Sequence, residues 1–431
     1  MNKSINKNYI ALLIGQTISQ LGSSMTSFAV IIWAYSNTEK VMASSLIAIC
    51  SAVPYIIISL FGGAVADNMN KKKIMLTCDS IAALGSLVLL VCSCFNLLQI
   101  WVLCIINVIN GLMNAFQTPA SQVAITLLVD KEDYSRMGGI QSSLGAVIGI
   151  LNPILAAALL SIGGLQLVLC IDLITFLFAF FTLLIFIKIP DSISESKKVN
   201  TKELNESMKE GVLFIRQQKS ILLLLIMYSV LEFVGAISFD SMYSPLLLAR
   251  TGNNETVVGI VSATAAVGSL LASIFMSISK QSHKKLLVMF VGSIMCLCGI
   301  MLFGVGRSLV WWCVVAFFGC FGSPIYQTYQ TVILRENVPV FMQGRIFSLQ
   351  GMITQSLTPI GCLMGAVFAD YIFEPFMETS SALQEICSKI VGLGKGAGMG
   401  LMFVMAGLIG IIIIICLMRN ANIKTLGNDI K

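Results

Sequence analysis

The chain has 431 residues, of which 57% are hydrophobic and only 11% are charged, and its mean hydropathy is +0.90. A soluble domain carries about 25% charged residues, so this composition excludes a water-soluble globular protein and makes the bilayer its solvent. The net charge of +6 therefore does not indicate nucleic-acid binding. We interpret it through the preference of basic residues for cytoplasmic loops.

Apolar runs in chain order predict twelve membrane-spanning helices, because a crossing helix needs about 20 apolar residues. We place these runs at residues 9–35, 42–66, 74–94, 98–128, 139–162, 164–187, 220–249, 256–279, 286–306, 309–334, 346–371 and 397–418. The fold class is therefore all-α integral membrane. We expect an N-terminal six-helix bundle over 1–187, a cytoplasmic loop with an interfacial helix over 188–219, and a C-terminal six-helix bundle with a short cytoplasmic tail over 220–431.

The distribution of basic residues predicts the orientation of the chain. With the N-terminus placed in the cytoplasm, 22 of the 27 Lys and Arg residues fall in cytoplasmic segments. This is the bias that the positive-inside rule describes, and an even number of spans puts both termini in the cytoplasm. We expect a multi-pass protein of a bacterial plasma membrane that functions as a monomer.

The two halves of the chain share a pattern. Gln117-Thr118 in the fourth run precedes Arg136 and Gln141, and the tenth run repeats this order at nearly the same spacing with Gln327-Thr328, Arg345 and Gln350. Two fused six-helix units are one known transporter architecture.

A short charged hinge joins the second and third runs. It contains Gly63, Asp67 and the triplet Lys71, Lys72 and Lys73. We expect Gly63 to let two helices approach closely, Asp67 to accept hydrogen bonds from the N-terminus of a neighbouring helix, and the lysines to hold lipid phosphates or loop carboxylates. The alternative for the lysines is that they only fix the side of the loop.

The hinge resembles the signature loop of the major facilitator superfamily, Gly-x-x-x-Asp-x-x-x-Arg/Lys-Arg/Lys. Within that superfamily the chain is similar to the macrolide-efflux and siderophore-exporter group in residues 115–120, 344–349, 359–361, 373–377 and 394–398. The resemblance implies two pseudo-symmetric bundles, alternating access, antiport and multidrug efflux. Two departures concern coupling: Asn110 stands where many members carry an arginine, and Gly145-x-x-x-Gly149 with Pro153 follows the antiporter signature only loosely.

Four carboxylates fall inside the apolar runs, where ionisable residues are costly and so mark functional positions. A desolvated carboxylate can take up and release a proton near neutral pH. We expect Glu232, and after it Asp240 and Asp172, to carry the proton coupling; the alternative is a structural hydrogen-bonding role. Asp79 lies near the cytoplasmic end of its run, and we expect it to pair with a loop cation; the alternative is a functional role within the membrane.

Polar residues at helical spacing predict the wall of a substrate cavity. They are Gln16, Gln20, Tyr55, Asn107, Asn110, Asn114, Gln117, Tyr326, Gln327, Gln330, Gln350 and Thr354. Neutral donors and acceptors of this kind suit a bulky amphipathic ligand better than a small anion. The alternative is that they are polar contacts between helices.

Several classes of site are missing from the sequence. A single histidine, His283, predicts no metal site. Residues 392–396 lack the preceding strand and the Ser/Thr of a phosphate-binding loop, so we expect no nucleotide and no cofactor. Without a nucleophile–base pair the chain is predicted not to be an enzyme.

The function predicted from these observations is proton-coupled efflux of amphipathic, macrolide-type molecules, with substrate, protons and the lipid bilayer as partners. The alternatives are export of a specific siderophore or lipid-like metabolite and, from a different class, a transport-inactive membrane sensor or scaffold.

Overall fold

The structure is a computed structural model that describes residues 7–68, 70–129, 134–187, 212–278, 284–424 and 426. Within these ranges it is helical and contains no β-strand. The chain divides into two compact units. Unit 1 comprises Met1–Thr38 and Leu46–Val199, and unit 2 comprises Glu39–Ser45 and Asn200–Lys431.

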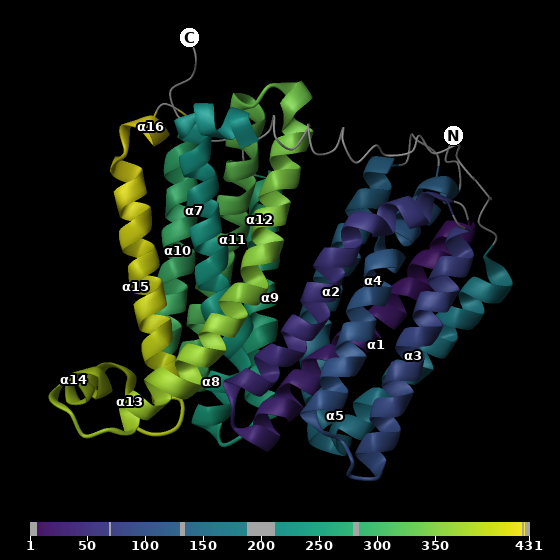
Figure 1. Cartoon of the computed structure of the whole chain (residues 1–431), viewed down its shortest axis with the longest axis horizontal. Helices are drawn as coiled ribbons and strands as arrows, with labels where there is room; N and C mark the ends of the chain where they lie inside the picture. Colours follow the sequence, from purple (N-terminus) through teal and green to yellow (C-terminus); the bar gives the residue numbers. More distant parts are fainter. Residues whose placement is uncertain are drawn as a thin grey trace. The chain divides into compact units, whose positions relative to one another are not determined.

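Unit 1 is built from long helices, because a helix satisfies its own backbone polar groups in a solvent that offers none. Its elements are α1 (Lys7–Thr38), α2 (Val41–Asn68, of which the first residues belong to unit 2), α3 (Lys71–Cys94), α4 (Ile100–Leu128), α5 (Tyr134–Phe181) and the π-helical turn η2 (Thr182–Phe186) (Figure 1). Helix α1 packs against α5, and α3 packs against both α4 and α5.

A non-helical break divides α5 at Gly163 and Gly164. Gly164 has φ of 64°, a left-handed conformation that glycine adopts without steric cost. The break separates residues 134–162 from residues 165–181, at the place where the sequence predicts one run to end and the next to begin.

Unit 2 contains further long helices and several short elements. They are α7 (Lys219–Gly235), η3 (Ala236–Asp240), α8 (Ser241–Thr251), α9 (Glu255–Ile278), α10 (Lys285–Val305), α11 (Leu309–Asn337), α12 (Val340–Phe368), η4 (Ala369–Phe373), α13 (Glu374–Glu378), α14 (Ala382–Val391), α15 (Ala397–Arg419) and α16 (Ala421–Lys424). Helix α11 packs against α9 and α10, and α10 also packs against α15.

Ten segments among the described residues are long and apolar enough to cross a membrane. The sequence predicts twelve, and the difference arises at two places. Helix α1 is not among the ten, since glutamines and hydroxyl side chains interrupt its apolar residues. Ser143–Phe186 counts as one segment of 44 residues although it contains the break at Gly163 and Gly164.

Helices α10 and α11 approach each other through glycines. A Cβ atom added to Gly299 would lie 2.5 Å from the Cα of Gly319, and one added to Gly322 would lie 2.5 Å from the carbonyl oxygen of Gly292. Small residues at such contacts let two backbones pack closely, which is the main source of helix association in lipid.

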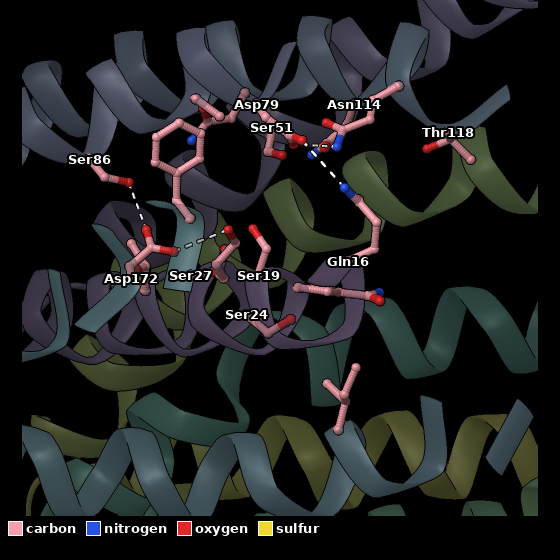
Figure 2. Close-up of a pocket in the computed structure, with 18 of the residues that line it drawn as sticks. Gln16, Ser19, Ser24, Ser27, Ser51, Asp79, Ser86, Asn114, Thr118 and Asp172 are labelled. Carbon is pink, nitrogen blue, oxygen red and sulfur yellow. Dashed lines mark hydrogen bonds between the residues drawn. The ribbon is translucent and has the colours of Figure 1, made fainter. Parts of the chain in front are cut away.

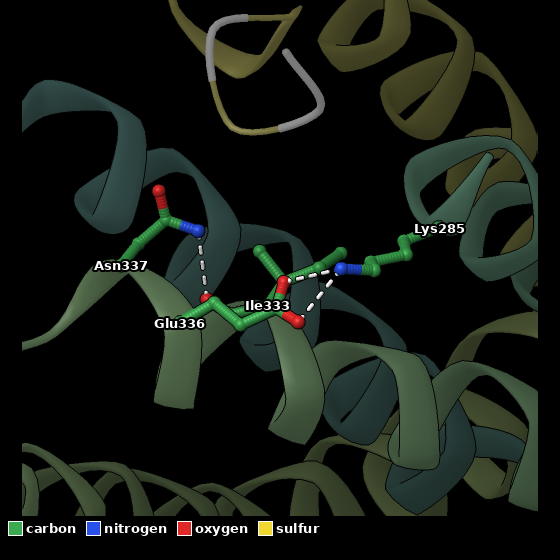
Figure 3. A network of polar contacts seen from close by, with 4 residues as sticks. All are labelled: Lys285, Ile333, Glu336 and Asn337. Atoms are coloured by element: carbon green, nitrogen blue, oxygen red, sulfur yellow. Dashed lines mark hydrogen bonds and ion pairs between the residues drawn. The ribbon is translucent and has the colours of Figure 1, made fainter. Parts of the chain in front are cut away.

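An ion pair joins the same two helices at one end. Lys285 Nζ, in the first turn of α10, lies 2.7 and 2.8 Å from the two carboxylate oxygens of Glu336 in the last turn of α11 (Figure 3). In the same turn, Asn337 Nδ2 donates to the carbonyl oxygen of Ile333 at 2.8 Å. Because an exposed ion pair contributes about 0–1 kcal/mol, we attribute most of the α10–α11 association to the glycine contacts.

A methyl group at Gly299 tests the importance of this packing. We expect Gly299→Ala to lower the stability of the chain by about 1–3 kcal/mol, because the methyl group forces α10 away from α11. The measurement is the thermal unfolding midpoint in detergent. Gly351→Ala in α12 is the matched control, since its Cβ would meet no atom within 4 Å. Equal midpoints for the two variants would contradict the prediction.

Candidate functional site

Unit 1 encloses a cavity of about 1060 Å³. Side chains from all five of its helices, α1 to α5, line the cavity, and Figure 2 shows a selection of them. Pockets for drug-sized ligands have volumes of roughly 300–1,000 Å³, so this cavity is large enough for a bulky molecule.

The wall of the cavity is rich in neutral amides and hydroxyls. Helix α4 contributes a stripe at steps of three, four and three residues, which lies on one helical face: Asn107, Asn110, Asn114 and Gln117. Helix α1 contributes Gln16, Ser19, Gln20, Ser23, Ser24 and Ser27, and α2 contributes Ser51 and Tyr55. The structure thus places the predicted cavity residues of the N-terminal half around one space.

Asp79 is buried in this wall, with an exposed fraction of 8%. Its carboxylate accepts a hydrogen bond from Gln117 Nε2 of α4 at 2.5 Å. It also accepts one from Gln16 Nε2 of α1 at 3.5 Å, and Figure 2 labels Asp79 and Gln16. The expectation that Asp79 pairs with a loop cation is therefore wrong. The side chain points from α3 into the bundle, where its partners are neutral amides.

Asp172, in the part of α5 after the break, is the second buried carboxylate of the cavity. It accepts from Ser86 Oγ at 2.7 Å and from Ser23 Oγ at 3.2 Å, so it joins α5 to α3 and α1. Figure 2 shows the bond to Ser86. A Cβ on Gly22 would collide with the hydroxyl of Thr175 and lie 3.1 Å from Asp172 Oδ1. Glycine at position 22 is thus what lets α1 reach this carboxylate.

The charge of the cavity is one-sided. Asp79 and Asp172 line it, and none of the described residues around it is a lysine, an arginine or a histidine. The side-chain oxygens of Asn110 and Asn152 are buried there without a hydrogen-bond partner among the described residues. The wall therefore offers acceptors and negative charge to a ligand that brings donors or a positive charge.

Unit 2 holds the other predicted proton-coupling residues, Glu232 and Asp240, which do not line this cavity. Glu232 Oε1 accepts from the hydroxyl of Tyr326 at 3.1 Å. The side chain of Tyr228 also interacts with Glu232, and it contacts Gln350 and Thr354 as well. Asp240 is the last residue of the π-helical turn η3.

Two further predicted cavity residues of unit 2, Gln327 and Gln330, differ in their hydrogen bonding. Gln327 Nε2 lies 3.5 Å from the hydroxyl of Tyr326. Gln330 is 1% exposed, and neither polar atom of its amide has a partner in the described part of the chain.

The predicted hinge is described only in part. Gly63 and Asp67 belong to α2, but their side-chain surroundings lie outside the described residues. Helix α3 begins at Lys71, where the Asn70 side chain accepts from the Lys73 N–H at 3.0 Å. Lys72 Nζ donates to the carbonyl oxygens of Leu184 and Ile187 at 2.9 and 2.8 Å. Lys72 thus binds the carbonyls at the end of η2, where a cation is favourable.

Sequence reasoning overlooked Asp79, Ser86 and Asn152 as cavity residues. One signal for Asp79 was present: it is a carboxylate inside an apolar run, where ionisable residues are costly. Ser86 and Asn152 had no comparable signal, because single polar residues are common in membrane helices.

Comparison with known proteins gives consistent matches. A model of the Major Facilitator Superfamily matches residues 12–362. Macrolide efflux protein A of Streptococcus pyogenes is 26% identical over 385 residues, which are 89% of this chain and 94% of that protein. The staphyloferrin A transporter of Staphylococcus aureus is 22% identical over 379 residues, 86% and 90% of the two chains.

Solved structures show the same fold. A bacterial homolog of the human lysosomal transporter Spinster has a TM-score of 0.69 at 15% identity and covers 99% of this chain and 98% of its own. A bacterial homologue of the iron transporter ferroportin has a TM-score of 0.66 at 14% identity, with 96% and 99% covered.

A double-mutant cycle tests the bond between Ser86 and Asp172. We expect Ser86→Ala to lower stability by about 1 kcal/mol, because it leaves a buried carboxylate with fewer donors. In the background of Asp172→Asn the same change should cost less, and the non-additivity of the unfolding midpoints measures the coupling. Ser80→Ala is the control, since the Ser80 hydroxyl bonds to Leu76 of its own helix. Additive effects would exclude the bond.

Proposed function

Because the chain belongs to the Major Facilitator Superfamily and is therefore a multi-pass transporter of the cell membrane rather than an enzyme, we propose that it exports amphipathic, drug-like molecules in exchange for protons. In this proposal the chain crosses the membrane twelve times with both termini in the cytoplasm. The two units act as two six-helix bundles that expose the substrate site to each side in turn.

The observation that carries this proposal is the cavity of unit 1. Its volume of about 1060 Å³ accepts a bulky molecule. Its amides, hydroxyls and apolar side chains suit an amphipathic surface, and Asp79 and Asp172 attract a positively charged group. The similarity to macrolide efflux protein A supports the same class of substrate.

The two carboxylates also provide a route to proton coupling. Each is held by neutral partners that can change roles: the Gln117 amide donates to ionised Asp79, and after a rotation its oxygen can accept from the protonated acid. A proton and the cationic group of a substrate therefore compete for the same carboxylate, which is the requirement for antiport. We propose this role for Asp79 and Asp172, with Glu232 and Asp240 as the proton sites of unit 2.

The hinge has a separate role in the proposal. We assign gating to Gly63, Asp67, Lys71, Lys72 and Lys73, and the bonds from Lys72 to the end of η2 support a mechanical function for the triplet.

Charge separates this proposal from its alternatives. A polyanionic siderophore would require basic side chains, and the described lining of the unit 1 cavity has none. A lipid-like metabolite would not require the carboxylates. A transport-inactive sensor or scaffold would bind ligand without moving it.

Replacing Asp79 tests the coupling. In inside-out vesicles with an acidic lumen, we expect Asp79→Asn to reduce accumulation of a radiolabelled macrolide to that of vesicles without the transporter. Equilibration down a macrolide gradient should persist, since the cavity retains its size and amides. Glu385→Gln, an exposed carboxylate on α14, is the control. Gradient-driven accumulation equal to wild type in Asp79→Asn would refute the role of this residue.

The same assay decides the role of Glu232. We expect Glu232→Gln to weaken the response to the pH gradient, because the amide keeps the contact with Tyr326 but cannot exchange a proton. Tyr326→Phe removes that contact and retains the acid, so it should keep the pH response. If Glu232→Gln transports like wild type at every gradient, the proton site of unit 2 lies elsewhere.

A further inference from the structure

Three basic side chains gather around a small pocket at one end of unit 2. The pocket has a volume of about 310 Å³, and Arg250, Arg307 and Lys395 contribute to its wall together with residues 391–393. It lies where α8 and α10 end and α15 begins. This end is opposite to α16 along α15 (Figure 1), and the charge bias of the loops predicts that it faces the outside.

Arg250 forms the base of this pocket. Its guanidinium donates to four backbone carbonyls, those of Gly304 at 2.9 Å, Val391 at 3.0 Å, Gly396 at 3.4 Å and Gly306. The carbonyls of Gly304, Gly306 and Val391 lie at the C-terminal ends of α10 and α14, where a cation is favourable, and Gly396 directly precedes α15. Arg250 therefore fixes the pocket by joining α10, α14 and the start of α15, and both of its terminal guanidinium nitrogens are occupied.

Among the described residues, the carboxylates of Glu374 and Glu39 lie near these basic groups. Glu374 interacts electrostatically with Arg250, and its Oε1 accepts from the backbone N–H of Met399 at 3.0 Å. Glu39 forms a 2.7 Å ion pair with Lys395, and the side chains of Glu39 and Lys395 are 58% and 70% exposed. Such an exposed pair opens at little cost.

Arg307 is different, because it forms no ion pair with a carboxylate of the described residues. It lies close enough to Arg250 for the two charges to repel each other. A Cβ added to Gly392 would lie 2.9 Å from Arg307 Cζ, so the guanidinium rests directly on the loop that lines the pocket. An anion between the two arginines would remove their repulsion.

Beside the pocket, α14 presents an apolar face to its surroundings. Leu383, Ile386 and Ile390 are 67%, 58% and 46% exposed, at the spacing of one helical face, and Leu393, just after the helix, is 74% exposed. In Figure 1, α14 lies beyond the end of α15 and away from the other long helices. An amphipathic helix next to a membrane span places such a face in the lipid interface.

We propose that this pocket binds the phosphate group of an anionic phospholipid, whose acyl chains run along the apolar face of α14. The volume is at the lower limit for small-molecule pockets and suits a headgroup. A zwitterionic lipid brings a cation of its own, which Arg250 and Lys395 repel. The site is separate from the transport cavity of unit 1.

Native mass spectrometry of the full chain in detergent tests this site. We expect one dioleoyl phosphatidylglycerol molecule to remain bound, in preference to dioleoyl phosphatidylcholine. Arg307→Gln should weaken binding about five-fold, the effect of one basic side chain near an anionic surface. Arg307→Lys keeps the charge and should retain binding. Lys389→Gln removes the same charge from the exposed surface of α14 and should leave binding unchanged.

Two further experiments distinguish binding of a lipid from binding of a free anion. Inorganic phosphate in excess should not displace the lipid, because it lacks acyl chains to contact α14, and Ile386→Asn should weaken lipid binding. Displacement by phosphate, equal binding of the two lipids, or equal effects of Arg307→Gln and Lys389→Gln would each overturn the proposal.

Discussion

Inside a bilayer no water is available to bond a polar atom, so a carboxylate there has to find its partners within the protein. In unit 1 this constraint determines the site. Asp79 joins α3 to α1 and α4, and Asp172 joins α5 to α1 and α3. The bonds that line the cavity are also the bonds that hold its helices at their spacing.

Polar bonds of this kind average only about 0.6 kcal/mol in membrane proteins, so close packing has to supply the rest. The glycines of α10 and α11 allow their backbones to meet, and Gly22 allows the same between α1 and α5. Gly22 is next to Ser23, which donates to Asp172. Gly22 thus allows α1 and α5 to pack closely and also lets the neighbouring Ser23 reach Asp172 in the cavity wall.

The predictable parts of the structure were those that depend on local pattern. The stripe from Asn107 to Gln117 follows from the helical period alone, and the break in α5 lies where the predicted run 139–162 ends and the run 164–187 begins. The partners of Asp79 were mispredicted because they lie 63 and 38 residues away, and a single sequence does not reveal which helices are neighbours. The pocket around Arg250 was out of reach for the same reason, since its carbonyl partners come from three separate elements.

The one-sided charge of the unit 1 cavity has an electrical consequence. With Asp79 and Asp172 ionised and no basic residue among the described lining residues, the empty cavity carries two negative charges, whereas two protons, or one proton and one singly charged cationic molecule, neutralise it. Moving one elementary charge through a membrane potential of 100 mV changes the free energy by about 2.3 kcal/mol. In the proposed cycle, voltage therefore acts on the unloaded carrier and hardly on the loaded one. Because the cell interior is negative, the resting potential then opposes inward return of the empty, anionic transporter and favours its return loaded with protons.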